Sequence, residues 1–320
     1  MRCARREWLA SVALLSVLAA GVPAQQHDRA SPSVAPHEHT PVELDGTPIV
    51  ARIDLSVQRP RRVLLDRTGG LYVVDAGAGR VLRRGPDGEM TTLAEGLDEP
   101  TGLALGRDGQ VYVANHAGGR ERRGSILRIP PRGRPAVLVD GLTGPGALAV
   151  SPRGTLFVAL PEAGEIATVD GDGRISTYVK DIAAPAGLAF DRGGDLLVAS
   201  ADAGRLSRIT ADRQVHIVAR GLEFPTDVAV DSRGRAIVAC YGGGELSEID
   251  DEGRVAPFAS VTPGTIGLAL DADDNVYLAN WDFRFVLRMT LHLSVPCPHC
   301  DKRIPVRIRS RPDDEPRNVF

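Results

Sequence analysis

The chain has 320 residues, 43% of them hydrophobic, which is enough for one large domain or two ordinary ones. Its 35 glycines and 23 prolines exclude a mainly helical protein, because both residues interrupt helices and favour turns. The 38 basic and 41 acidic residues are mixed along the chain and give a formal net charge of -3, so we predict no nucleic-acid surface.

The first 24 residues have the pattern of a secretory signal peptide. An arginine-rich start is followed by an apolar run from Trp8 to Val22, and small residues around Ala24 offer a cleavage site. This run of about 15 residues is short for a bilayer span, so we expect no stable membrane insertion after cleavage. Residues 25–44 lack apolar periodicity and are predicted to be a linker. The sequence therefore predicts an exported monomer, periplasmic or extracellular.

Residues 45–290 repeat one pattern six times. The clearest copy is the segment GQVYVAN at residues 109–115, and its counterparts begin at residues 69, 154, 194, 234 and 274. The spacing is 40 residues except for one interval of 45, whose extra residues lie within 116–124 and carry several arginines. Repeats in phase over this length indicate a repeat architecture.

Each copy predicts four short strands. The first follows a proline, as at 100–105, and is apolar at successive positions, which is typical of a strand covered on both faces. We expect the second strand at 111–114, the third at 126–129, and an outer strand such as 175–179 after a turn rich in glycine and aspartate. Six four-stranded units of this size are typical of a β-propeller, with a solenoid as the alternative.

The sixth copy lacks an outer strand after Met289, whereas residues 48–57 precede the first copy and belong to none. We expect this segment to pair with the last sheet and close the ring, because closure removes two exposed sheet edges. The predicted fold is an all-β, six-bladed β-propeller with four-stranded blades, closed by an N-terminal strand.

The segment GQVYVAN, with PTGLA at residues 100–104, is similar to the repeat core of NHL-repeat proteins. It also resembles the related propellers of the gluconolactonase/senescence-marker family and of the streptogramin lyases. The resemblance covers about residues 45–290 and implies a ligand site on one rim or in the central channel. It does not imply one activity, because these families share a repeat and differ in their sites.

Residues that break the repeat are candidates for ligand binding. The position two residues after the blade proline is glycine or alanine in four copies but Arg62 and Asp227 in the other two. These two charges could face one another across the channel mouth and hold a polar ligand, or they could form a plain ion pair.

A second set of candidates follows the second strands, whose loops should share one rim with the loops that precede the first strands. The candidates in this set are Asn115, His116, Tyr241, Asn280, Trp281 and Asp282. A histidine and two aromatic rings around a channel mouth suit a sugar, a peptide or a flat ligand. Ordinary packing and turn formation by asparagine and aspartate are the alternatives.

The resemblance to gluconolactonases implies a metal-binding aspartate directly after a blade proline, but this chain has Thr226 there and Asp227 one residue later. A shift of one residue turns a strand side chain to the opposite face. The family's early Glu-Gly-Pro is also missing, and the lyase histidine and glutamate have no matching residues. We therefore favour a scaffold that binds a small molecule, glycan or protein, with no assigned catalytic residue. The alternative is a lactonase-like hydrolase with calcium or zinc, or a lyase.

Residues 291–320 leave the repeat and contain Cys297 and Cys300 in a Cys-Pro-His-Cys segment. Asp301 stands where a c-type haem site needs histidine, which excludes that site. The following residues are β-like, whereas a redox pair of this kind needs a helix N-terminus. The two cysteines are predicted to form a disulfide or a degenerate half of a zinc knuckle, with zinc shared between two chains as the second alternative. Cys240 is predicted to be buried as a small hydrophobic residue.

Overall fold

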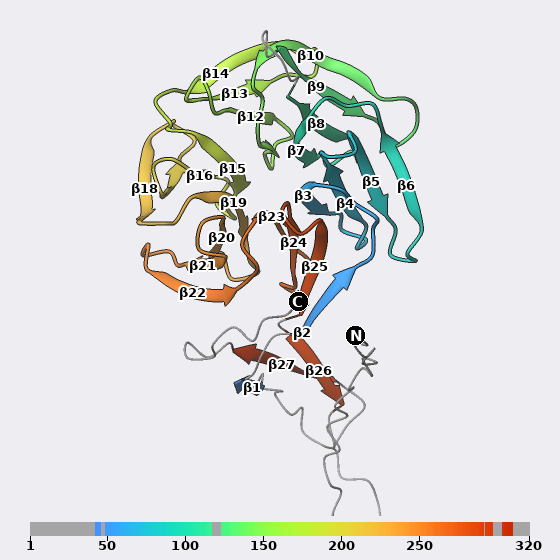
Figure 1. The fold of residues 1–320 in the computed structure, drawn as a ribbon. Helices are drawn as coiled ribbons and strands as arrows, with labels where there is room; N and C mark the ends of the chain where they lie inside the picture. The colour runs from blue at the N-terminus through green and yellow to red at the C-terminus, as the bar shows by residue number, and fades with distance from the viewer. Residues whose placement is uncertain (1–41, 46–48, 117–122, 291, 297–302, 310–320) are drawn as a thin grey trace, which may run out of the picture. The chain divides into compact units, whose positions relative to one another are not determined.

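The computed structural model describes residues 42–45, 49–116, 123–290, 292–296 and 303–309 (Figure 1). The regular structure of these residues consists of β-strands alone, in six four-stranded sheets and one three-stranded sheet. No helix capable of crossing a membrane occurs in these ranges. The predicted signal peptide, the tip of the arginine-rich insertion, and Cys297 and Cys300 lie outside the described residues.

The six four-stranded sheets are antiparallel blades that follow one another around a common axis (Figure 1). Blade 1 consists of β3 (Pro60–Leu65), β4 (Leu71–Asp75), β5 (Arg80–Arg84) and β6 (Met90–Ala94). Blade 2 consists of β7 (Pro100–Leu105), β8 (Val111–Asn115), β9 (Arg123–Ile129) and β10 (Ala136–Thr143). Blade 3 consists of β11 (Leu148–Val150), β12 (Leu156–Leu160), β13 (Glu165–Val169) and β14 (Ile175–Val179).

The remaining three blades repeat this order. Blade 4 consists of β15 (Pro185–Phe190), β16 (Leu196–Ser200), β17 (Arg205–Ile209) and β18 (Val215–Arg220). Blade 5 consists of β19 (Pro225–Val230), β20 (Ala236–Cys240), β21 (Glu245–Ile249) and β22 (Val255–Ser260). Blade 6 consists of β23 (Thr265–Leu270), β24 (Val276–Asn280), β25 (Phe285–Thr290) and β2 (Ile49–Ile53).

The ring is closed by β2, as the sequence predicts. This strand pairs antiparallel with β25, so that Ile49 lies opposite Thr290 and Ile53 lies opposite Val286. The innermost strand of blade 6, β23, also contacts the innermost strand of blade 1, β3. Both observations confirm the six-bladed propeller and set aside the solenoid.

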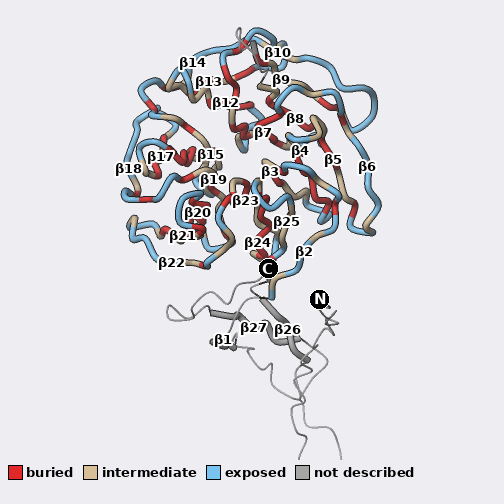
Figure 2. Tube along the Cα trace, viewed as in Figure 1, coloured by how far each residue is buried: buried red, intermediate tan, exposed pale blue. Residues whose placement is uncertain are grey.

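The hydrophobic core consists of six clusters, each formed by two neighbouring blades. At the closure, Val63 and Val73 of blade 1 pack with Tyr277 and Ala279 of blade 6. The second strands of blades 1, 4, 5 and 6 are buried at every position, because a blade lies against each of their faces. The outer strands are largely exposed (Figure 2). Cys240 is buried in the cluster between blades 4 and 5.

The first strand carries a β-bulge in blades 1, 2, 4, 5 and 6. In blade 5, Pro225 lies opposite Cys240 and Asp227 lies opposite Ala239, so Thr226 has no partner on β20. A bulge inserts one residue and turns its side chain away from the regular alternation. The residue directly after the blade proline therefore has a direction that strict alternation does not predict.

The loops after the second strands meet the loops before the first strands, which forms the predicted rim. In five blades the first residue after the second strand donates its backbone N–H to the carbonyl of the residue just before the first strand. The bonds are Ala76 to Arg59 (2.9 Å), His116 to Glu99 (3.0 Å), Ala201 to Ala184 (3.1 Å), Tyr241 to Phe224 (3.1 Å) and Trp281 to Gly264 (2.9 Å).

The three-stranded sheet joins the two ends of the described chain. Its strand β1 (Val42–Asp45) pairs parallel with β27 (Arg303–Arg309), and β26 (His292–Pro296) pairs antiparallel with β27. The predicted tail thus contains two strands, and β1 begins within the segment predicted to be a linker.

Candidate functional site

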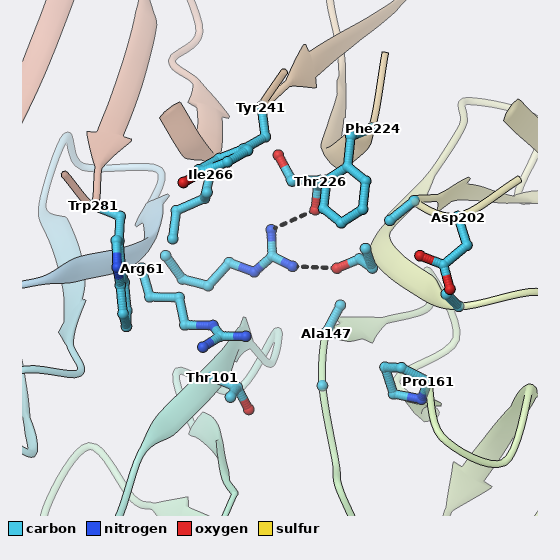
Figure 3. Close-up of a pocket in the computed structure, with 15 residues that line it drawn as sticks. Arg61, Thr101, Ala147, Pro161, Asp202, Phe224, Thr226, Tyr241, Ile266 and Trp281 are labelled. Carbon is cyan, nitrogen blue, oxygen red and sulfur yellow. Dashed lines mark hydrogen bonds between the residues drawn. The ribbon is translucent and has the colours of Figure 1, made fainter. Parts of the chain in front are cut away.

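A cavity of about 400 Å³ lies on the rim where these loops meet (Figure 3). Each of the six blades contributes to its lining the residue one position after the blade proline, or the equivalent residue in blade 6. These residues are Arg61, Thr101, Gly146, Ala186, Thr226 and Ile266. Because this is the bulged position in five blades, the backbone irregularity places these side chains at the cavity.

Three aromatic side chains line the cavity: Phe224 before β19, Tyr241 after β20 and Trp281 after β24 (Figure 3). The Phe224 and Tyr241 rings are in edge-to-face contact, with centroids 6.2 Å apart. The Tyr241 hydroxyl donates a hydrogen bond of 3.3 Å to the Asp282 carboxylate. Small residues such as Ala147 and Ala201 complete an otherwise mainly apolar wall. Such a wall can accept the flat face of a ligand.

Phe224 combines exposure with an unfavourable backbone conformation. Its side chain is 49% exposed, and its φ of 54° lies in the left-handed region. The same position is left-handed in four other blades, where it is Glu99 (φ 50°), Gly144 (φ 54°), Ala184 (φ 41°) or Gly264 (φ 86°). The conformation therefore belongs to the blade fold, but bulky residues adopt it rarely. Blade 5 thus places an aromatic ring at the cavity in a position where the other blades have a glycine, an alanine or a charged residue.

Arg61 places a positive charge in the cavity. Its guanidinium lies 5.6 Å from the centre of the Trp281 ring. Burial, and after it the nearby Arg62 charge, lower the pKa of Arg61 to about 10, and Glu99 opposes the shift. Within the described part of the chain, the Arg61 guanidinium forms no hydrogen bond and no ion pair. It is thus a half-buried cation whose donors are directed to no protein acceptor.

Arg62 and Asp227 form a buried ion pair, which is one of the two arrangements proposed from the sequence. The Asp227 carboxylate also accepts backbone N–H groups from Val228 (3.0 Å) and Leu268 (2.9 Å), and Arg62 donates to the carbonyl of Ala186. Burial raises the pKa of Asp227, and the Arg62 charge and the backbone donors oppose that rise. The hydrogen-bonding capacity of the pair is therefore largely used within the protein.

The pair lies at the boundary between two cavities. Arg62 lines the rim cavity and also a second cavity of about 310 Å³, which Asp227 lines as well. The second cavity is bordered mainly by apolar residues of the innermost strands, such as Leu105 and Leu270. The ion pair therefore divides the central channel, and Asp227 belongs to the side away from Thr226 and the rim cavity.

The remaining residues predicted for the rim site do not line the cavity. Asn280 is fully buried; its amide donates to the Pro263 carbonyl (2.9 Å), and its side-chain oxygen accepts the Phe283 N–H (2.8 Å). These bonds fix the turn that carries Trp281. Asn115, His116 and Asp282 also lie outside the lining. The structure thus brings together Arg62, Tyr241 and Trp281 of the predicted set, with Asp227 directly behind Arg62.

Arg61, Phe224 and Asp202 line the cavity although they are not among the residues predicted from the sequence. A signal for two of them was present. Arg61 is the one charged residue in the column directly after the blade proline, and Phe224 is the one aromatic residue in the column directly before it.

The residues of the cavity do not fit a divalent metal ion. Calcium needs several converging oxygen ligands, whereas Asp202 supplies the one carboxylate of the lining. The Thr101 and Thr226 hydroxyls already donate to backbone carbonyls, and Arg61 adds a positive charge. Among the described residues, no group of three or more His, Cys, Asp or Glu could hold a metal.

Comparison with known proteins identifies similar folds. No protein-family model matches this chain, and no curated protein matches it. A gluconolactonase from Xanthomonas campestris is 16% identical, with 76% of this chain and 89% of that chain covered and a TM-score of 0.65. A streptogramin B lyase is 13% identical, with 76% and 97% covered and a TM-score of 0.60. A PQQ-bound aldose sugar dehydrogenase from Streptomyces coelicolor is 16% identical, with 76% and 98% covered and a TM-score of 0.59. At these identities the likeness establishes the shared fold alone, and the chain is a six-bladed β-propeller similar to the gluconolactonase and streptogramin lyase propellers.

Proposed function

We propose that this protein is an exported binding propeller that takes a small ligand with a flat apolar face into the rim cavity. The single observation that carries the proposal is Phe224, a half-exposed ring kept at the cavity in a left-handed backbone conformation. Folding alone gives no reason to retain an aromatic side chain there, because glycine or alanine serves the same left-handed position in three other blades. A bound ligand that packs against the ring supplies that reason.

The size and lining of the cavity support the proposal. A volume of about 400 Å³ is within the range of small-molecule sites, which are mainly apolar with a few polar groups. Tyr241 and Trp281 extend the aromatic wall begun by Phe224. Aromatic walls of this kind suit a planar ring or the apolar face of a sugar.

A second candidate is an enzyme of the lactonase or lyase type, and its support is the likeness to propellers with those names. The donor set of the cavity speaks against a metal-dependent mechanism, since its one carboxylate is accompanied by a guanidinium.

The proposal can be tested through Trp281. The chain has two tryptophans, and Trp8 belongs to the predicted signal peptide, so a protein that begins at Gln25 has Trp281 alone. Titration with the neutral aromatic probe phenylacetamide should produce a saturable change in its fluorescence. Cyclohexylacetamide, which has no planar ring, should bind more weakly. The absence of saturation in a folded protein would contradict the proposal.

A further inference from the structure

The rim cavity contains two adjacent arginines of β3 with different surroundings. Arg62 is paired with the Asp227 carboxylate and donates to the Ala186 carbonyl. Arg61, at the preceding residue, has neither kind of partner among the described residues. Figure 3 shows the Arg61 guanidinium between the Trp281 ring and Thr101, whereas the dashed bonds of the figure come from Arg62. The strand β3 thus supplies one guanidinium with hydrogen-bond and ion-pair partners and one guanidinium without them.

An unpaired guanidinium in a half-buried position is costly, because removing a charge from water is compensated only by a partner. The lowered pKa of Arg61 has the same origin: burial comes first, followed by repulsion from Arg62. Glu99 opposes the shift but forms no ion pair with Arg61. Asp202, the carboxylate of the lining, forms no ion pair with Arg61 either. An anion placed in the cavity would offset both the burial and the repulsion.

The surroundings of Arg61 limit the chemistry of that anion. A guanidinium is planar and presents parallel N–H donors that match the two oxygens of a carboxylate. Trp281 lies against Arg61, while Phe224 and Tyr241 lie across the cavity (Figure 3). A ligand that uses both features has a carboxylate at one end and a flat ring at the other. A volume of about 400 Å³ accommodates a small molecule of this class.

On the basis of the proposed function, we infer that the rim cavity is specific for a ring-bearing carboxylic acid whose carboxylate binds to Arg61. The ring packs on the aromatic wall, and Arg61 distinguishes the acid from its neutral analogues. The Arg62–Asp227 pair takes no direct part, because its donors and acceptors are already used.

The test compares phenylacetate with phenylacetamide, which differ in charge but hardly in shape. Wild-type protein should bind phenylacetate about tenfold or more tightly, as expected for a charge-assisted hydrogen bond in a partly dry site. Arg61→Gln should remove this preference and leave phenylacetamide binding in place. Arg59→Gln is the matched control, because Arg59 also lies on the Trp281 ring, at 5.4 Å, but outside the cavity lining. That variant should keep the preference.

The outcomes separate this inference from the proposed function. Equal binding of both probes by wild-type protein, or a preference that persists in Arg61→Gln, overturns the carboxylate inference and leaves the binding function standing. Failure of both probes to bind overturns the two together. The thermal unfolding midpoint of Arg61→Gln should equal or exceed that of wild type, because an unpaired charge is removed. A large decrease would show that Arg61 is needed for the fold, against the inference.

Discussion

Replacing Phe224 by glycine should separate ligand binding from stability. Phe224 has a φ of 54°, and a left-handed conformation costs a non-glycine residue about 1–2 kcal/mol, which Phe224→Gly removes. Glycine adds back about 0.5–1 kcal/mol through the entropy of the unfolded chain. Burial of a whole phenylalanine contributes about 1.5–3 kcal/mol, and this ring is 49% exposed, so roughly 1 kcal/mol of burial is lost. The free energy of unfolding should therefore change by less than about 1 kcal/mol.

Binding should respond more strongly. The ring offers its exposed half to a ligand, and an aromatic contact with the associated burial contributes about 1–2 kcal/mol, or on the order of 5- to 30-fold in Kd. The assay is titration of Trp281 fluorescence with phenylacetamide, together with urea unfolding followed by circular dichroism. Both measurements are made on the same preparation of the Phe224→Gly variant.

Two control variants test the backbone conformation and the loss of a buried ring separately. Asp181→Gly relieves a similar conformation (φ 62°) at an exposed residue outside the cavity lining, and it should leave phenylacetamide binding unchanged. Phe157→Ala removes a buried ring that contacts Tyr178 and Phe190 edge-to-face, and it should cost about 3–5 kcal/mol. The reasoning is refuted if Phe224→Gly loses as much stability as Phe157→Ala, or if it binds the probe as wild type does.

Further expectations concern the ion pair, an acidic turn and the buried thiol. Asp227→Asn should lower the free energy of unfolding by about 3–5 kcal/mol, because it leaves the buried Arg62 uncompensated. The double variant with Arg62→Ala should lose less of this free energy than the sum of the two single variants, and additive losses in urea unfolding would contradict this. Burial alone would raise the pKa of Asp66, but hydrogen bonds from two side chains and two backbone N–H groups lower it from 3.8 to about 2. A carboxyl group whose pKa is lowered by folding stabilises the folded protein at pH values above its unfolded-state pKa, so this contribution should be lost as the pH falls from about 4 to about 2. In Asp66→Asn, the stability should therefore depend less on pH over that interval, as measured by acid titration followed by circular dichroism. Burial raises the pKa of the Cys240 thiol, so a disulfide reagent should label it no faster than the protein unfolds, and rapid labelling of native protein would count against the predicted core position.

The sequence predicted the blades well because their strands depend on features that recur. Burial on both faces and the turn residues recur through six copies and the blade proline through five, and the missing strand of the sixth copy identified residues 48–57 as the closing segment. The structure assigns this strand to Ile49–Ile53. Few of these features depend on contacts between distant residues, which is why they can be read from one chain.

The site was harder to predict because it depends on an irregularity. The search for residues that break the repeat selected the column two residues after the proline and so Arg62 and Asp227. The bulge places the preceding column in the cavity lining, which brings in Arg61. Asn280 was a reasonable candidate by residue type, but its polar atoms are used by neighbouring backbone groups that no sequence pattern names.

The pairing of β2 with β25 also orders the events of folding. During synthesis, β2 is made before every other strand of the ring but can find its partner only after β25 has been made, since Ile49 lies opposite Thr290. All strands of the other five blades precede β25 in the chain, and β25 presents an open edge until β2 pairs with it. The pairing of β2 with β25 is therefore the step that closes the propeller. A chain that lacks residues 49–53 should remain open at β25 and be prone to self-association.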